Sequence, residues 1–259
     1  MLEMKLHQTS VKNIPLIELY REGIGHQRVP IVLLYHGFTS SKERKLEHAY
    51  LLAQAGLFVV LPDAVRHGDR EDEAFAALSF EQKAEFLFEI VQETARETEL
   101  LLEHYRQQSW IDTENSGIIG TSMGGMILFE YLANGGLNNI KTGVSIISTP
   151  DFGSVIDRAL EEYQNNFRRY PQSEITRVKN EQPLPRIRDL RNFPLLLLNA
   201  EDDPTIPFEP VRELYDELYR KYEQKDLVKM RYYRHTGHET TAEMMRESVR
   251  WMSRRLLLH

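Results

Sequence analysis

The chain of 259 residues carries 32 Lys and Arg against 39 Asp and Glu, a formal net charge of −7, and it contains no Cys. Without Cys, the chain cannot build a disulfide scaffold, a Cys-based zinc site or an iron–sulfur cluster, nor use a thiol nucleophile. The acidic balance argues against a nucleic-acid-binding protein, because such proteins need a basic surface to neutralise phosphates.

The apolar runs of this chain are short. The longest, such as residues 31–35 and 195–198, fall far below the roughly 18–20 residues of a membrane-spanning helix. The N-terminal segment has no apolar stretch of signal-peptide length. We therefore expect no membrane span and a cytoplasmic protein.

Short runs rich in Val, Ile and Leu alternate with longer amphipathic segments, the pattern of βαβ units around a mostly parallel sheet. In the first half of the chain, strands are expected at 4–10, 15–20, 29–35, 57–61 and 117–121. A capping box of Ser40 and Glu43 predicts the start of one helix, which ends at Gly56. A second, long helix is expected from Ser79 to about Tyr105.

In the second half, helices are expected at 123–133, 211–222 and 241–257, and strands at 142–148, 194–199 and 228–233. More than 40 residues separate the first two of these strands, where a plain crossover needs about a dozen. We expect one domain over residues 1–259 with an insertion at 151–192 that contains a helix at 157–169. Long insertions are often lids or binding elements; the alternative is a surface decoration.

Residues 120–124 (GTSMG) lie between an expected strand and an expected helix, the context that the nucleophile-elbow motif G-x-S-x-G requires. A sharp strand-to-helix turn strains the central residue and presents its hydroxyl above the sheet, while small neighbours let the two backbone arms pass closely. The sequence therefore predicts Ser122 as a nucleophile. The alternative is a Gly-rich turn that happens to contain a serine.

A serine nucleophile needs a general base, and the base needs an acid that orients it. After a nucleophile elbow these follow in the order acid, then His. Of nine His, only His235, His238 and the terminal His259 lie late enough in the chain. Because Gly237 lets the loop turn the next ring toward the nucleophile, we predict His238 as the base and keep His235 as the alternative.

The acid is sought at the carboxyl end of a strand, where α/β sheets place functional groups. Residues 200–207 (AEDDPTIP) directly follow the strand expected at 194–199. Their spacing matches the run G-x-x-D-x-x-[VI]-P, with Asp203 at the acid position and Ala200 at the Gly position. We predict Asp203 as the acid, with Asp202 and Glu201 as alternatives.

An acyl-transfer site also needs an oxyanion hole. One backbone N–H is expected from Met123, the residue after the nucleophile, and the second from Phe38 in the loop after the strand at 29–35. In that loop we expect the His36 imidazole to brace the turn rather than to react. Charged residues at 62–69 are expected to form structural ion pairs.

The sequence predicts neither a metal nor a cofactor. The His residues form no H-E-x-x-H or similar ligand pattern. No G-x-G-x-x-G or P-loop run is present, so no nucleotide cofactor is indicated.

With these motifs in this order, the whole chain resembles the α/β-hydrolase superfamily. The run LYHGFTSSKE at 34–43 is similar to small bacterial esterases near dienelactone hydrolase and the catalytic domain of prolyl oligopeptidases. The resemblance implies an eight-stranded, mostly parallel sheet flanked by helices, with its second strand antiparallel and a small cap inserted after the sixth strand. Two departures stand out: Ala200 replaces the usual Gly, and the chain lacks the Cys nucleophile of the dienelactone type.

We therefore expect a serine hydrolase that cleaves small carboxylic esters of short to medium acyl length. Aromatic residues of the insertion either line an acyl pocket or pack the cap onto the body: Phe152, Tyr163, Phe167 and Tyr170. Its basic residues either attract an anionic substrate such as an acyl-CoA or form a solvated face: Arg158, Arg168, Arg169, Arg177 and Lys179.

Three other functions stay open at this point. An acyl-CoA thioesterase would follow if the basic residues bind substrate. A small-peptide or amide hydrolase would use the same residues. A non-catalytic binding protein can share the same fold, although it has no need of an ordered Ser, Asp and His. The sequence carries no pattern that predicts an oligomeric state.

Overall fold

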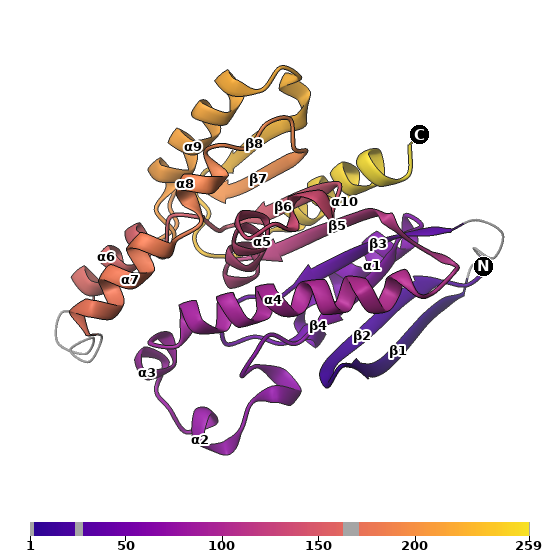
Figure 1. The fold of residues 1–259 in the computed structure, drawn as a ribbon, viewed down its shortest axis with the longest axis horizontal. Helices are drawn as coiled ribbons and strands as arrows, with labels where there is room; N and C mark the ends of the chain where they lie inside the picture. The colour runs from indigo at the N-terminus through magenta and orange to yellow at the C-terminus, as the bar shows by residue number, and fades with distance from the viewer. Residues whose placement is uncertain (1–2, 24–27, 163–170, 259) are drawn as a thin grey trace.

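The fold is centred on one eight-stranded sheet with the strand order β1-β2-β4-β3-β5-β6-β7-β8 (Figure 1). The structure is a computed structural model, and it describes residues 3–23, 28–162 and 171–258. Strand β2 runs antiparallel to both of its neighbours, while the pairs from β4 through β8 are parallel. This topology confirms the α/β-hydrolase fold that the sequence predicted.

All eight strands occur where alternation predicted them, with small changes at the ends. Their bounds are β1 Met4–Val11, β2 Ile14–Arg21, β3 Val29–Tyr35, β4 Phe58–Pro62, β5 Ile111–Thr121, β6 Thr142–Ile146, β7 Leu195–Ala200 and β8 Val228–Tyr233. Strand β5 is the main difference, because it starts six residues before the expected 117–121. Its early residues pair with the start of β3 before a register shift between Pro30 and Ile31.

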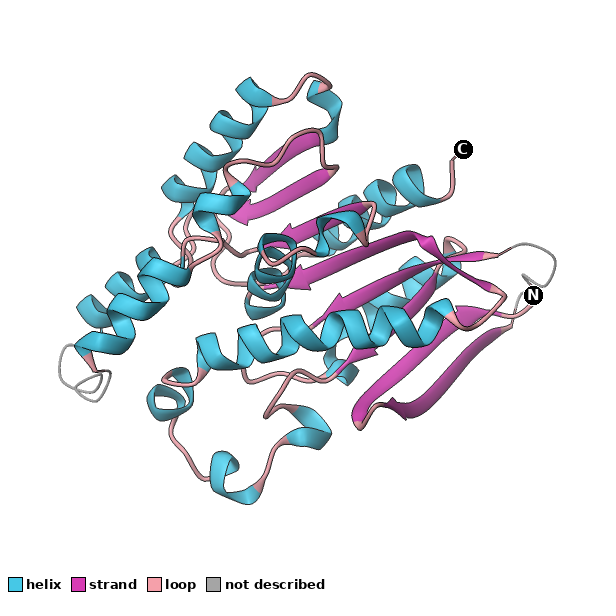
Figure 2. Cartoon of the chain, viewed as in Figure 1, coloured by secondary structure: helices cyan, strands magenta, loops and turns pink. Residues whose placement is uncertain are grey.

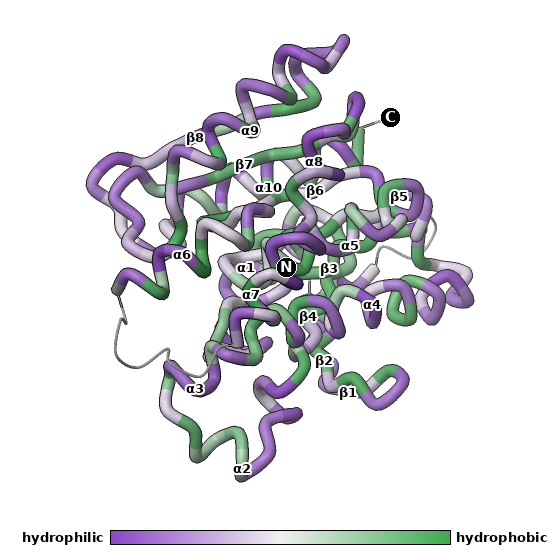
Figure 3. Tube along the Cα trace, turned by 60° about the vertical axis from the view of Figure 1, so that its left-hand side comes forward, coloured by the Kyte–Doolittle hydropathy of each residue, from purple (hydrophilic) through white to green (hydrophobic). Residues whose placement is uncertain are grey.

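Helices cover both faces of the sheet, and each face has its own hydrophobic core (Figure 2). In β3, Ile31 and Leu33 belong to the core under α4 (Leu87–Arg106) and α5 (Met123–Ala133). Val32 and Leu34 belong to the core under α1 (Leu46–Gln54) and α10 (Ala242–Leu256). Because both faces of β3 are buried, its sequence is continuously apolar. In Figure 3, stretches of the central strands carry the hydrophobic colour.

Two helix starts differ from the sequence prediction. The capping box of Ser40 and Glu43 does not form; a 3-10 turn, Lys42–Lys45, precedes α1 and has no side-chain cap. Instead, the Lys42 N–H donates to the Asp63 carboxylate at 3.0 Å, so a tertiary contact replaces the local one.

The long helix expected from Ser79 to Tyr105 is broken in two. Ser79 and Gln82 form a capping box, but this box starts only the short α3 (Phe80–Ala84), and α4 begins at Leu87. Residues on both sides of the break, Ala84 and Leu87, line one cavity. The remaining helices are α2 Glu73–Ala76, α6 Phe152–Glu162, α7 Gln172–Glu181, α8 Leu184–Ile187 and α9 Phe208–Lys221.

Two segments lie beyond the carboxyl ends of the central strands. One runs from β4 to α4 and carries α2 and α3; the other runs from β6 to β7 and carries α6, α7 and α8. Figure 1 shows α3 and the α6–α7 pair on the side of the molecule toward which the arrowheads of β3 and β5 point. Helix α6 begins at Phe152, earlier than the helix expected at 157–169, and the described part ends at Glu162.

Candidate active site

The turn between β5 and α5 holds Ser122 in a strained backbone conformation. Its φ is 53° and its ψ is −117°, a combination that L-residues rarely adopt. The flanking glycines are required by contact: a Cβ on Gly120 would lie 2.0 Å from the Gly124 carbonyl oxygen, and a Cβ on Gly124 would lie 2.5 Å from the Tyr35 carbonyl oxygen. The tight crossing of these backbones therefore excludes any side chain at either position.

The structure brings Ser122, His238 and Asp203 into one hydrogen-bonded chain. Ser122 Oγ lies 2.8 Å from His238 Nε2, and His238 Nδ1 lies 2.8 Å from Asp203 Oδ2. The Asp203 side chain is 1% exposed, and its Oδ1 accepts the N–H groups of Thr205 at 2.8 Å and Ile206 at 2.9 Å. These two bonds orient the carboxylate so that its other oxygen faces the imidazole.

The alternative acid and base lie away from this chain. The side chain of Asp202 is 60% exposed and that of His235 is 94% exposed, and the two lie 3.8 Å from each other. Glu201 is exposed and lies 3.5 Å from Arg234. None of these three side chains makes a hydrogen bond to Ser122 or His238 in the described part of the chain.

The loop after β3 passes directly beside Ser122, because a Cβ on Gly37 would lie 3.5 Å from Ser122 Cβ. Within the described residues, the Phe38 N–H makes no hydrogen bond. Met123 is the first residue of α5, so its N–H has no intrahelical acceptor. Among the described residues, the fold's own hydrogen bonds therefore use neither of the two N–H groups that the sequence predicted for an oxyanion hole.

Two buried histidines hold this loop through their acceptor nitrogens. His36 Nε2 accepts the Ala64 N–H at 3.1 Å, so its Nδ1 carries the proton that it shares with the Gly37 carbonyl at 2.8 Å. His67 Nε2 likewise accepts the Thr39 N–H at 3.0 Å. Burial lowers the pKa of His36 to about 4 and also lowers the pKa of His67, so both rings stay neutral acceptors at pH 7.

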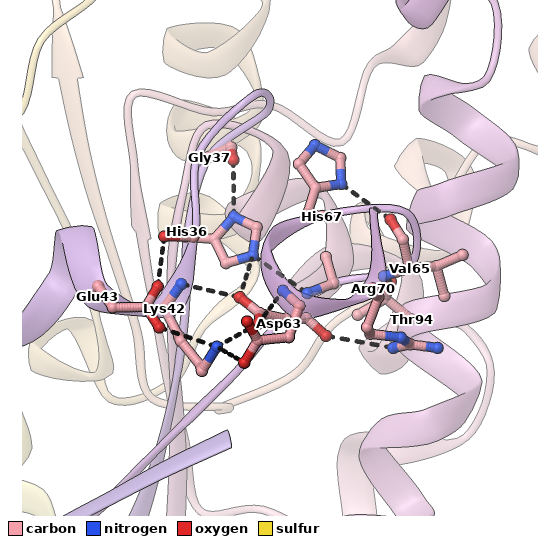
Figure 4. Close-up of polar contacts among 12 residues, drawn as sticks. His36, Gly37, Lys42, Glu43, Asp63, Val65, His67, Arg70 and Thr94 are labelled. Atoms are coloured by element: carbon pink, nitrogen blue, oxygen red, sulfur yellow. Dashed lines mark hydrogen bonds and ion pairs between the residues drawn. The ribbon is translucent and has the colours of Figure 1, made fainter. Parts of the chain in front are cut away.

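A buried ion pair lies under the same loop (Figure 4). The Asp63 side chain is fully buried, and it accepts Lys42 Nζ at 2.6 Å and the Asp69 N–H at 3.0 Å. Burial opposes the charge of Lys42, but its bonds to Asp63, Asp69 and Glu43 raise its pKa above the usual value. These contacts agree with the structural ion pairs expected at 62–69.

A cavity of about 270 Å³ opens beside Ser122 and His238. Its walls are mostly apolar and come from the loop after β3, from α3 and α4, from α5 and from α6. The lining residues are Phe38, Thr39, Phe80, Ala84, Leu87, Phe88, Ser122, Met123, Met126, Val155, Ile156, Arg158, Ala159, Thr205, Ile206 and His238. The contribution of α3 and α4 was missed in the sequence, where their apolar residues form an ordinary amphipathic stripe.

Of the aromatic residues predicted for the cap, only Phe152 lies within the described residues. Its ring is buried and packs 5.0 Å from the ring of Phe88, so it packs the insertion onto the body rather than lining the cavity. Tyr163, Phe167 and Tyr170 lie outside the described residues, as do Arg168 and Arg169.

Two basic residues of the insertion are paired with carboxylates close to them. Arg177 bonds to Glu174 and lies 2.7 Å from Glu181, and Lys179 lies 2.6 Å from Asp157. These ion pairs support the solvated-face alternative for both residues.

Within the described ranges, no group of three or more His, Asp or Glu could hold a metal ion. Over the same residues, no helix is long and apolar enough to cross a membrane.

Comparison with known proteins places this geometry in a family. The model of the prolyl oligopeptidase family matches residues 45–257. The chain is 29% identical over 258 residues to the Bacillus subtilis (strain 168) protein named "Putative esterase YitV", covering 96% of this chain and 98% of that protein. It is 26% identical over 223 residues to "Esterase YjfP" of Escherichia coli (strain K12), covering 83% and 85%. The crystal structure of TT1662 from Thermus thermophilus superposes with a TM-score of 0.75 at 16% identity, covering 99% and 100% of the two chains.

Proposed function

The chain belongs to the prolyl oligopeptidase family, and we propose that it is a serine hydrolase that cleaves carboxylic esters of short to medium acyl length. The observation that carries this proposal is the hydrogen-bonded chain of Ser122, His238 and Asp203, in which Ser122 and His238 line a mostly apolar cavity. The names of the two relatives, "Putative esterase YitV" and "Esterase YjfP", support an ester over an amide substrate. The small cavity volume, about 270 Å³, supports a short acyl group.

In the proposed mechanism, Ser122 Oγ attacks the ester carbonyl while His238 Nε2 takes the hydroxyl proton. Asp203 keeps the other imidazole proton on Nδ1 and stabilises the imidazolium. The Phe38 and Met123 N–H groups bind the oxyanion. When the intermediate collapses, Nε2 returns the proton to the leaving alcohol, and an acyl-enzyme forms.

The second half of the reaction repeats these roles with water. His238 Nε2 takes a proton from the water that attacks the acyl-enzyme, and then returns it to Ser122 Oγ as the acid leaves. We further propose that residues 151–192 act as a cap, because α6 supplies one wall of the cavity.

The proposal is tested with 4-nitrophenyl acetate, butyrate, octanoate and laurate on the wild type and Ser122→Ala. We expect the highest kcat/KM at butyrate or octanoate, and a loss of up to about 10⁶-fold in kcat in the variant with unchanged unfolding by urea. Equal turnover by the two proteins would refute Ser122 as the nucleophile. A folded wild type that cleaves butyryl-CoA in preference to 4-nitrophenyl butyrate would instead indicate a thioesterase.

A further inference from the structure

Arg158 is the one permanently charged side chain in the cavity wall, as far as the described residues go. It projects from α6 among apolar neighbours on the same helix, Val155, Ile156 and Ala159. No Asp, Glu or Lys is among the described lining residues. A guanidinium at this place therefore gives an otherwise apolar pocket a positive charge.

Arg158 also differs from Arg177 and Lys179, two other basic residues of the same segment. Arg177 and Lys179 each lie against carboxylates of α6 or α7. Arg158 makes one hydrogen bond in the described part of the chain, from Nη1 to the Asp203 backbone carbonyl at 2.8 Å. A backbone carbonyl orients the guanidinium but carries no negative charge, and no carboxylate is paired with Arg158 among the side chains that the structure describes.

The chemistry of this group favours an anion with two oxygens. A guanidinium presents five N–H donors in a planar fork that matches a carboxylate, and it remains charged at every pH of interest. Apolar walls exclude water and strengthen the attraction between the two charges. The carbonyl of Asp203 occupies one donor, so several others remain for a substrate.

We propose that Arg158 binds a carboxylate of the substrate, so that the preferred esters carry a negative charge on their acyl or alcohol part. The inference deepens the proposed esterase function and rests on it. Arg158 then selects the substrate and does not take part in the chemical steps. The bond to Asp203 alone would make Arg158 a brace for the acid loop, and the test must separate these two roles.

The test has two arms, one for each position of the carboxylate. The acyl arm compares mono-4-nitrophenyl esters of adipic, pimelic and suberic acids with neutral esters in which an isopropyl group replaces the carboxylate. The alcohol arm compares 4-carboxyphenyl butyrate with 4-carbamoylphenyl butyrate. Each kcat/KM is divided by the hydroxide-catalysed rate of the same ester, which removes differences in intrinsic reactivity.

We expect the wild type to prefer the charged ester in one arm by about tenfold to a hundredfold, the range of a charge-assisted hydrogen bond. Arg158→Gln should abolish this preference, and Arg158→Lys should retain part of it because the charge remains. Arg177→Gln, a matched change on a half-buried arginine of the same segment that does not line this cavity, should leave the preference intact. Which arm responds identifies the part of the substrate that carries the charge.

An equal loss for charged and neutral esters in Arg158→Gln would overturn the inference, since a brace acts on both alike. So would a wild type with no preference at any chain length in either arm, a result that does not depend on the variant folding. If the proposed esterase function itself is wrong, the experiment gives a different result. In that case the wild type does not cleave even the neutral butyrate ester.

Discussion

Asp203→Asn changes one atom of the site and should reverse the tautomer of the catalytic imidazole. In the wild type, Oδ1 accepts the N–H groups of Thr205 and Ile206, and Oδ2 accepts the His238 Nδ1–H. An asparagine has one carbonyl oxygen, and it must take the Oδ1 position. The opposite orientation would leave both N–H groups facing an amide NH₂, and the buried Ile206 N–H alone would cost about 1–3 kcal/mol when unpaired.

The asparagine NH₂ group then faces His238 Nδ1, which must become an acceptor. The ring proton moves to Nε2 and points at Ser122 Oγ, 2.8 Å away, so the ring can no longer take the serine proton. Loss of the correct tautomer in a Ser-His-Asp triad lowers kcat by about 10⁴-fold. Because the bonds to Thr205 and Ile206 persist, we expect little change in the free energy of unfolding.

The assay is steady-state hydrolysis of 4-nitrophenyl butyrate, with urea unfolding of each protein as a check on folding. Asp202→Asn is the matched control, because that carboxylate is 60% exposed, and we expect its kcat within twofold of the wild type. If Asp203→Asn unfolds normally and keeps kcat within tenfold, the tautomer argument is wrong. A large loss in Asp202→Asn would assign the acid to the neighbouring residue.

Three further predictions concern the elbow, the core and the loop beside the site. Gly120→Ala should lower stability by about 3 kcal/mol in urea unfolding, because its Cβ would lie 2.0 Å from backbone; normal stability would refute this clash. Burial lowers the pKa of His48 to about 3, so only the unfolded chain gains a proton as pH falls below about 6.5, and stability falls with it. Between pH 7 and pH 5, the free energy of unfolding of His48→Leu should fall by about 2 kcal/mol less than that of the wild type. Urea titrations in which the two proteins show the same pH dependence would contradict the argument. His67→Phe keeps the packing of the ring but removes the acceptor of the Thr39 N–H. This variant should lower kcat by up to about 10²-fold with little change in KM. An unchanged kcat would show that His67 does not position the loop.

The local sequence was sufficient to predict the strands and the nucleophile elbow. Strand β3 has the bounds that its apolar run predicted, because a strand buried on both faces needs apolar residues throughout. The elbow is equally local, since crowding at Gly120 and strain at Ser122 involve residues of one turn. The order of the catalytic residues along the chain and the spacing of the acid run were also enough to select His238 and Asp203. The structure brings these two side chains within hydrogen-bond distance of each other.

Tertiary contacts decided what depends on residues far apart in the chain. The capping box predicted at Ser40 does not form, and the Lys42 N–H bonds to Asp63 instead. Asp63 is a buried carboxylate 21 residues away, so no helical spacing could have revealed this contact. The cavity lining is another case: the sequence left Phe152 open between lining a pocket and packing the cap onto the body, and in the structure it packs on Phe88 while Arg158 faces the site. An amphipathic stripe shows which face of a helix is apolar. Only the packing of that helix on the sheet determines whether the face meets the core or the substrate.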